Sequence, residues 1–131
     1  MSLVLKHGGN EEQTTLAAAA AICRVLERDC GISPSIKPVN DIMVEGKKVC
    51  GILCEAVCGQ NGNIETVVVG IGMNTFMKNY TFPNDLKDTA GTVQTVLSSK
   101  ELSNKIVREI INTISRGRAY FLPEYETRIQ N

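Results

Sequence analysis

Apolar and polar residues alternate along this chain with two different periods. The apolar run at residues 2–6 predicts a short strand. The alanine-rich stretch 16–26 predicts a helix able to lie close against a sheet, and Asn10 with Gln13 three residues later predicts a capping box at its start. Gly31 suits the left-handed residue that ends many helices, so we expect the helix to stop there.

The middle of the chain has the pattern of a β-hairpin followed by a buried strand. Residues 41–44 and 48–57 are rich in strand-forming side chains and flank a Glu-Gly pair that suits a tight turn. The sequence GQNGN at 59–63 predicts the next turn. The stretch 64–72, IETVVVGIG, is β-branched and apolar on both faces, which predicts a strand in the centre of its sheet. Residues 35–37 are too few to assign from the pattern alone.

The C-terminal part predicts a loop, a helix and a final packed segment. Residues 73–92 show little regularity and are expected to form the loop. Ser98 and Glu101 predict a second capping box, after which apolar residues recur at helical spacing up to the next glycine. The last stretch, 119–131, is expected to pack by its aromatic side chains without adding a strand. The whole chain, 1–131, is expected to be one domain.

Composition and charge narrow the classes of function. Apolar residues make up 43% of the chain and charged residues 21%, as in ordinary globular proteins. Fourteen basic and fourteen acidic residues cancel, which disfavours nucleic acid and anionic membranes as partners. The longest apolar run, residues 16–23, is eight residues long, whereas a membrane span needs about 20. We therefore expect a soluble cytoplasmic protein.

The cysteines suggest core residues more than a metal site. There are five, an odd number that favours reduced thiols over a disulfide framework. Cys50, Cys54 and Cys58 recur every four residues and so look like a row of metal ligands. The chain has one histidine and no Cys-x-x-Cys pair, however, and a spacing of four on a strand only repeats one face. The pattern therefore favours small apolar residues in a core.

Three other features imitate functional motifs. GIGMN at 70–74 begins like a dinucleotide fingerprint, but the third glycine would fall at Thr75 and no helix is expected to follow. Arg116 and Arg118 flank a glycine and could grip a phosphate, but positive charge at a helix end also complements the helix dipole, and this structural interpretation is favoured. His7 has no nucleophile near it in sequence and is assigned no role.

A polar cluster of Lys37, Asn40 and Asp41 precedes the predicted hairpin, whose second strand starts beside Lys47 and Lys48. Taken alone, such residues are typical of a turn and of solvated strand ends. The full stretch KPVNDIMVEGKKVCGILCE, however, resembles the biotin-protein ligases. The catalytic domains of that family carry Lys-Trp-Pro-Asn-Asp, followed by a hairpin that reads Lys-x-x-Gly-Ile-Leu-x-Glu.

The resemblance continues on both sides of this motif. VVVGIGMN at 67–74 is similar to the family's next strand with its Gly-Ile-Asn end, and MSLVLK at 1–6 looks like the strand before the family's long helix. The likeness covers roughly residues 1–75 with the same order and spacing, which reverses the preference for a simple turn. Lipoate ligases share the fold and are the nearest alternative.

The resemblance implies an α+β fold, a mixed and largely antiparallel sheet packed with helices, of the class II synthetase-like type. It also implies a two-step reaction that uses ATP, biotin and magnesium. The biotin carboxylate attacks the α-phosphate of ATP, and the biotinyl adenylate then acylates a lysine on the biotin carboxyl carrier domain of a carboxylase.

The resemblance also assigns roles on the second hairpin strand. Lys48 matches the family lysine that stabilises developing negative charge, so it is expected to be the catalytic cation. Lys47 is expected to point away from the site. Gly51 lacks a side chain and is expected to let a flat ligand approach the strand.

Four further residues are candidate ligand contacts. Asp41 is expected to hold magnesium or to orient cationic groups. Asn40 and Asn74 each offer a donor and an acceptor that suit an adenine edge or phosphate oxygens. Lys37 is expected either to contact phosphate or to support the turn.

The chain also departs from the family pattern. Pro38-Val39 replaces the family's Trp-Pro, which removes an aromatic wall. The family's N-terminal half, with its Gly-Arg-rich loop, would precede residue 1, so we expect a truncated domain that is inactive alone. It is either a fragment or one chain of a split enzyme, in which a separate chain supplies this half. The alternative is a non-catalytic binding or interaction module with the same fold. An uncovered sheet edge further predicts a homo-oligomer.

Overall fold

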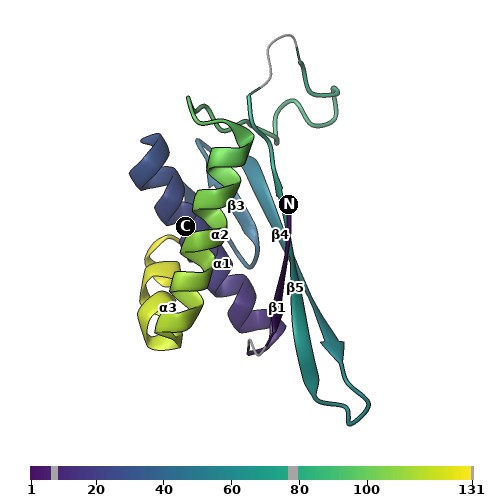
Figure 1. Cartoon of the computed structure of the whole chain (residues 1–131). Helices are drawn as coiled ribbons and strands as arrows, with labels where there is room; N and C mark the ends of the chain where they lie inside the picture. Colours follow the sequence, from purple (N-terminus) through teal and green to yellow (C-terminus); the bar gives the residue numbers. More distant parts are fainter. Residues whose placement is uncertain (7–8, 77–79, 131) are drawn as a thin grey trace.

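Five antiparallel strands form one sheet in the order β1-β5-β4-β3-β2, and three helices lie on one of its faces (Figure 1). The computed structural model describes residues 1–6, 9–76 and 80–130, so His7 lies outside the described residues. The elements are β1 (Ser2–Lys6), α1 (Glu11–Cys30), β2 (Ser35–Lys37), β3 (Asp41–Val44), β4 (Lys47–Cys58), β5 (Ile64–Met73), α2 (Ser99–Arg116) and α3 (Arg118–Thr127). This arrangement confirms the expected α+β fold. Parallel pairing within the described ranges is confined to isolated bridges, such as that of Ile36 with Ile129.

Helix α1 is the centre of the molecule. Residues 17–23 are fully buried, because the sheet lies on one side of the helix and α2 and α3 pack against it as well. A run of alanines suits this position, since short side chains let the helix approach its neighbours closely. The side chain of Asn10 accepts from the N–H of Gln13 (2.8 Å), and Gly31 follows the helix with φ of 65°. The predicted start and stop of the helix are confirmed.

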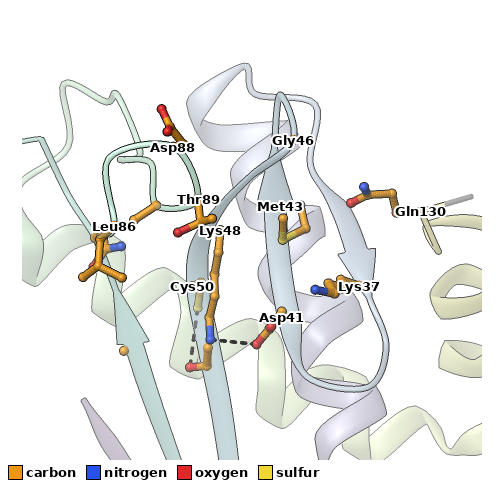
Figure 2. Close-up of a pocket in the computed structure, with 14 residues that line it drawn as sticks. Lys37, Asp41, Met43, Gly46, Lys48, Cys50, Leu86, Asp88, Thr89 and Gln130 are labelled. Carbon is orange, nitrogen blue, oxygen red and sulfur yellow. Dashed lines mark hydrogen bonds and ion pairs between the residues drawn. The ribbon is translucent and has the colours of Figure 1, made fainter. Parts of the chain in front are cut away.

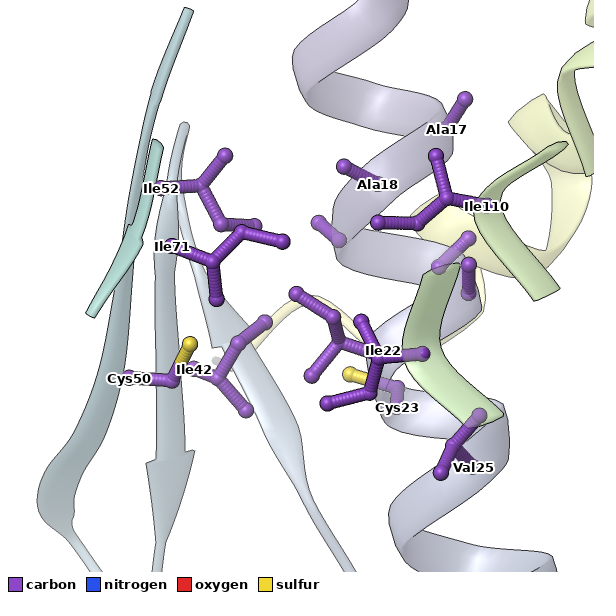
Figure 3. Packing of buried hydrophobic residues seen from close by; sticks show 14 of the residues in the cluster. Ala17, Ala18, Ile22, Cys23, Val25, Ile42, Cys50, Ile52, Ile71 and Ile110 are labelled. Carbon is purple, nitrogen blue, oxygen red and sulfur yellow. The ribbon is translucent and has the colours of Figure 1, made fainter. Parts of the chain in front are cut away.

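The core lies between α1 and the sheet. Figure 3 shows Ile42, Ile52 and Ile71 of the sheet facing Ile22 and Cys23 of α1. All five of these side chains are at most 5% exposed. Alternate residues of the strands therefore point at the helices, and the residues between them lie on the opposite, open face of the sheet.

The hairpin agrees with the sequence pattern, and the strand that follows it agrees in part. Glu45 and Gly46 both have positive φ, 51° and 76°, as a two-residue turn between twisted strands requires. Strand β5 pairs with β1 on one side and β4 on the other, so it is an interior strand, but β4 occupies the centre of the sheet that was predicted for β5. In the part of the chain that the structure describes, no helix has both the length and the apolarity to cross a membrane.

The C-terminal part adds one element that the pattern did not predict. Both halves of the capping box between Ser98 and Glu101 are present at the start of α2. The following aromatic stretch, which was expected only to pack, forms helix α3 and buries Phe121 and Tyr125. After α3 the chain runs beside β2, where the N–H of Gln130 donates to the carbonyl of Ile36 (2.8 Å). The end of the chain therefore extends the sheet at its β2 edge.

Candidate functional site

A hollow of about 690 Å³ lies on the open face of the sheet, over β3, β4 and the end of β5. Strands β2 and β3 form one wall, and the segment that follows β5 forms another (Figure 2). The lining residues are Lys37, Asp41, Met43, Gly46, Lys48, Cys50, Gly51, Gly72, Asn74, Leu86, Asp88, Thr89, Ala90 and Gln130. Five of the six predicted site residues are in this set.

A β-bulge turns Lys48 into the hollow. Ile42 pairs with Cys50 and Met43 pairs with Lys48, which leaves Val49 as an extra residue in β4. With regular alternation, Lys48 would share the helix-facing side with Cys50. The extra residue moves Lys48 to the other face, while both Val49 and Cys50 stay buried at 1% exposure. The bulge is thus the reason that the side chain of Lys48 points into the hollow.

Lys48 forms an ion pair that is seated on a glycine. Its Nζ lies 2.9 Å from Oδ1 of Asp41, and the two side chains are 48% and 23% exposed (Figure 2). Asp41 is the cross-strand partner of Gly51. A Cβ at Gly51 would lie only 3.2 Å from both Cε and Nζ of Lys48. A side chain at Gly51 would therefore crowd the lysine in this position, whereas the expected approach of a ligand to Gly51 stays a prediction.

The neighbouring Lys47 belongs to a different surface. It pairs with Val44 across the turn, and its ammonium donates to the carbonyl of Lys87 (3.4 Å). Lys47 lines a second hollow, which also contains Ile32 and Phe82, instead of the hollow that Lys48 enters. The two consecutive lysines thus point to opposite faces, as expected.

The other predicted residues divide into two groups. Lys37 pairs with Asp41 across β2 and β3 and lines the same hollow. Asn74 also lines it, and its Nδ2 donates to the carbonyl of Gly91 (3.2 Å). Asn40 lies outside the lining. Its Nδ2 donates to the carbonyl of Ile52 (2.9 Å), so its amide holds the turn against β4.

A wall of the hollow comes from a segment that the sequence pattern left as a loop. The N–H of Lys48 donates to the carbonyl of Thr89 (2.8 Å), and the N–H of Gly91 donates to the carbonyl of Lys48 (2.9 Å). These bonds bring Leu86 and Asp88 to the hollow. Nothing in the local pattern of residues 73–92 predicts this position. The signal that was present is the length of the segment, because long irregular connections in compact domains commonly carry function.

The thiol of Cys50, which lies beside the site, is expected to be unreactive. Burial raises the pKa of Cys50 to about 12, so this cysteine stays a neutral thiol at ordinary pH. A neutral thiol is neither a good nucleophile nor a metal ligand. Within the described ranges, no three His, Cys, Asp or Glu side chains are grouped to hold a metal ion.

Comparison with known sequences identifies the family. The model of the Biotin/lipoate A/B protein ligase family matches residues 5–74, a range that contains Lys48 and Asn74. The chain is 33% identical over 114 residues to the Bifunctional ligase/repressor BirA of Bacillus subtilis, which covers 85% of this chain and 35% of that protein. It is 37% identical over 78 residues to the Biotin--[acetyl-CoA-carboxylase] ligase of Paracoccus denitrificans, covering 56% of this chain and 32% of that protein. The chain belongs to the biotin/lipoate A/B protein ligase family, and the resemblance to biotin-protein ligases is confirmed.

Comparison with solved structures agrees on the fold. The biotin protein ligase from Aquifex aeolicus in complex with biotin and ATP superposes with a TM-score of 0.80 at 24% identity, over 98% of this chain and 56% of that chain. The chain spans about a third of the length of the curated relatives that it matches, 35% and 32%.

Proposed function

We propose that this chain forms the nucleotide-binding part of a biotin-protein ligase catalytic domain, where biotin and ATP react to give biotinyl-AMP and pyrophosphate. The observation that carries the proposal is the Lys48 ammonium. It is seated over Gly51, paired with Asp41 at 2.9 Å, and about half exposed at the wall of the hollow.

The position of Lys48 suits the stabilisation of developing negative charge. An ammonium has three N–H donors, and the ion pair with Asp41 occupies one of them. The remaining donors are available to a carboxylate and a phosphate that approach each other. Because the lysine is attached to a hydrogen-bonded strand and confined by Asp41, little reorganisation is needed when charge develops.

The rest of the hollow suits a nucleotide of this size and charge. A volume of about 690 Å³ lies in the range of small-molecule sites, about 300–1,000 Å³. Lys37 supplies a second cation from the opposite wall, and Asn74 supplies a carboxamide at the end of β5. Leu86 adds an apolar side chain that is 44% exposed and can cover a flat ring. Strand β5 contributes Gly72 to the lining.

The residues that the structure describes do not by themselves form a magnesium site. Asp41 and Asp88 are the carboxylates of the lining, and Asp41 is already paired with Lys48. Mg²⁺ is commonly held by one or two carboxylates together with substrate phosphates. The described residues therefore suit at most a metal that arrives with ATP, and we derive no step through it.

The second step follows from the chemistry of the adenylate. An amine of a lysine on a biotin carboxyl carrier domain attacks the acyl carbonyl of biotinyl-AMP, an amide bond forms, and AMP leaves. This partner is the one that the resemblance implies. The attacking amine belongs to another protein, so it must reach the adenylate from solvent. The hollow suits this approach, because the side chain of Lys48 in its lining is half exposed.

The test is the exchange of labelled pyrophosphate into ATP, measured with the protein in the presence of biotin, of lipoate, or of neither acid. We expect no exchange with this chain alone, and exchange with biotin but not with lipoate once the N-terminal half of a biotin-protein ligase catalytic domain is added. Exchange with lipoate instead of biotin would contradict the choice of acid. Binding of ATP by calorimetry without exchange under any condition would favour the non-catalytic module.

A further inference from the structure

The C-terminal segment holds the turn that leads into the site, although it lies far away in sequence. The hydroxyl of Tyr125, in α3, donates to the carbonyl of Val39 (2.9 Å). Just beyond α3, the carbonyl of Arg128 accepts from the N–H of Ile36 (2.7 Å), and the N–H of Gln130 donates back to Ile36 (2.8 Å). Three hydrogen bonds therefore join the end of the chain to residues 36–39.

The segment held in this way carries two residues of the hollow. Lys37 and Asp41 lie at either end of the turn that contains Val39, and both line the hollow. Strand β2 is only three residues long and pairs with β3 alone among the five strands. A short edge strand has few ladder hydrogen bonds, so bonds from outside the sheet have a large share in fixing its position.

Tyr125 is built into the core as a donor. Its side chain is buried, at 5% exposure, whereas Val39 is 47% exposed. Burial raises the pKa of the Tyr125 phenol above its ordinary value, so the hydroxyl stays protonated and continues to donate. A phenol fixed by packing determines where its acceptor lies more firmly than a mobile surface group would.

We propose that Tyr125 is a positioning residue for the Lys48–Asp41 pair: by holding the Val39 carbonyl, it keeps Asp41 opposite Gly51, where the lysine is seated. Asp41 is two residues beyond Val39, and its carboxylate fixes the ammonium of Lys48 at 2.9 Å. The effect on ligand binding rests on the proposed function, whereas the effect on the turn does not.

The experiment compares Tyr125→Phe with Tyr120→Phe. Both variants remove one hydroxyl from α3, but the ring of Tyr120 lies under Arg24 and Arg116, away from the turn. In the free protein, we expect amide hydrogen exchange of Asp41, which pairs with Lys37, and of Ile52, whose N–H donates to the carbonyl of Asn40 (3.0 Å), to become about 5-fold faster in Tyr125→Phe. This is the scale of one lost hydrogen bond. Equal exchange rates at these amides in the two variants would overturn the proposal.

A double-mutant cycle separates positioning from general destabilisation. ATP binding is measured by calorimetry for Tyr125→Phe, for Asp41→Asn and for the double variant. We expect Tyr125→Phe to weaken binding about 5-fold in the original protein and to have little further effect once Asp41 is replaced, because both changes act on the same pair. Fully additive losses would overturn the proposal. Absence of ATP binding by the unmodified protein would refute the proposed function, and the exchange rates would then decide the role of Tyr125 alone.

Discussion

Two ion-paired regions on opposite sides of the molecule use their cations differently. Between the helices, the guanidinium of Arg24 contacts Glu109 of α2 and Glu124 of α3 and also donates to Oγ1 of Thr113 (3.0 Å). The Arg24 side chain is 17% exposed, and that of Glu109 is 11% exposed. Burial by itself would lower the pKa of Arg24, but the hydrogen bonds that it donates to the two glutamates outweigh this effect, so the pKa is raised above its ordinary value. Both terminal nitrogens of this guanidinium therefore have protein partners.

On the open face of the sheet, fewer of the described protein groups contact the cation, which is Lys48. Lys48 contacts one carboxylate among the described residues, that of Asp41, and its side chain is 48% exposed. A half-exposed ion pair contributes little to stability, about 0–1 kcal/mol, whereas removal of one partner from a partly buried ion pair is strongly destabilising. The comparison indicates that Arg24 serves the fold and that Lys48 is available for a ligand.

The largest expected effect concerns the helix side. Arg24→Met removes the cation that joins Glu109 to Glu124 and, among the described residues, leaves Glu109 only the exposed Arg28 and Glu124 only Arg128. We therefore expect the free energy of unfolding to fall by about 3 kcal/mol. Urea unfolding measures this change. Arg28→Met is the control, because Arg28 also contacts Glu109 but is 52% exposed, and we expect it to cost less than about 1 kcal/mol. Equal losses in the two variants would contradict the division of roles.

The next effect concerns the hollow. In a complex of this chain with the N-terminal half of a biotin-protein ligase catalytic domain, Lys48→Ala is expected to lower the rate of biotin-dependent adenylate formation about 100-fold, the scale for removal of one charge-stabilising donor. Its free energy of unfolding should change by less than about 1 kcal/mol. Lys47→Ala is the matched control, because this lysine points to the other face of the hairpin. An unchanged rate in Lys48→Ala, measured by pyrophosphate release, would remove Lys48 from the site.

A pair of glycine variants tests why Gly51 is a glycine. Gly51→Ala would place a Cβ at 3.2 Å from Nζ of Lys48, whereas a Cβ at its strand partner Gly72 would have no atom within 4 Å. If Gly51 makes room for the lysine, Gly51→Ala should lower the adenylation rate about 10-fold through a small displacement of the ammonium, and Gly72→Ala should have little effect. Similar losses in both variants would show that close approach of a ligand to the floor is the stronger requirement.

The smallest effect is a dependence of stability on pH. Burial tends to raise the pKa of Glu109, but hydrogen bonds from Arg24 and Arg28 outweigh it and hold the pKa below its ordinary value. A carboxyl whose pKa is lowered by folding stabilises the protein above its unfolded pKa of about 4.3, and that stabilisation disappears as the pH falls through the folded pKa. Thermal unfolding measured from neutral to acid pH should therefore show a loss of stability in the unsubstituted protein. This loss should be smaller in Arg24→Met. A loss of stability of the same size in both proteins would show that carboxyls other than Glu109 cause it.

Features that depend on neighbouring residues were predicted well. The cap at Asn10, the left-handed Gly31 and the turn at Glu45 and Gly46 follow from local backbone requirements, and the structure has all three. The interior position of β5 follows from its apolar character on both faces. Helix α3 was not predicted, because its stretch has no clear apolar stripe and contains Pro123 within the helix. It forms beside α1 and α2, where packing overrides weak local preference.

The candidate site was predicted in part, for a similar reason. Lys37, Asp41, Lys48, Gly51 and Asn74 line one hollow, as the motif indicated, although their roles in ligand binding remain predictions. Asn40 belongs to the same motif, but its amide is used by the backbone of Ile52. A motif shows which residues occur together, whereas only the contacts around each side chain show which donors are free.

The sequence by itself determined the periodic elements, their caps and the motif that relates this chain to biotin-protein ligases. Only the tertiary structure decided which way the key side chains point and what surrounds them. The bulge at Val49 that turns Lys48 to the open face, the return of residues 86–90 to β4, and the hydrogen bond from Tyr125 to Val39 all depend on pairing between distant segments. The physical reason is that local backbone preference acts over a few residues, whereas the register of a strand and the face that a side chain occupies are selected by the packing of the whole sheet.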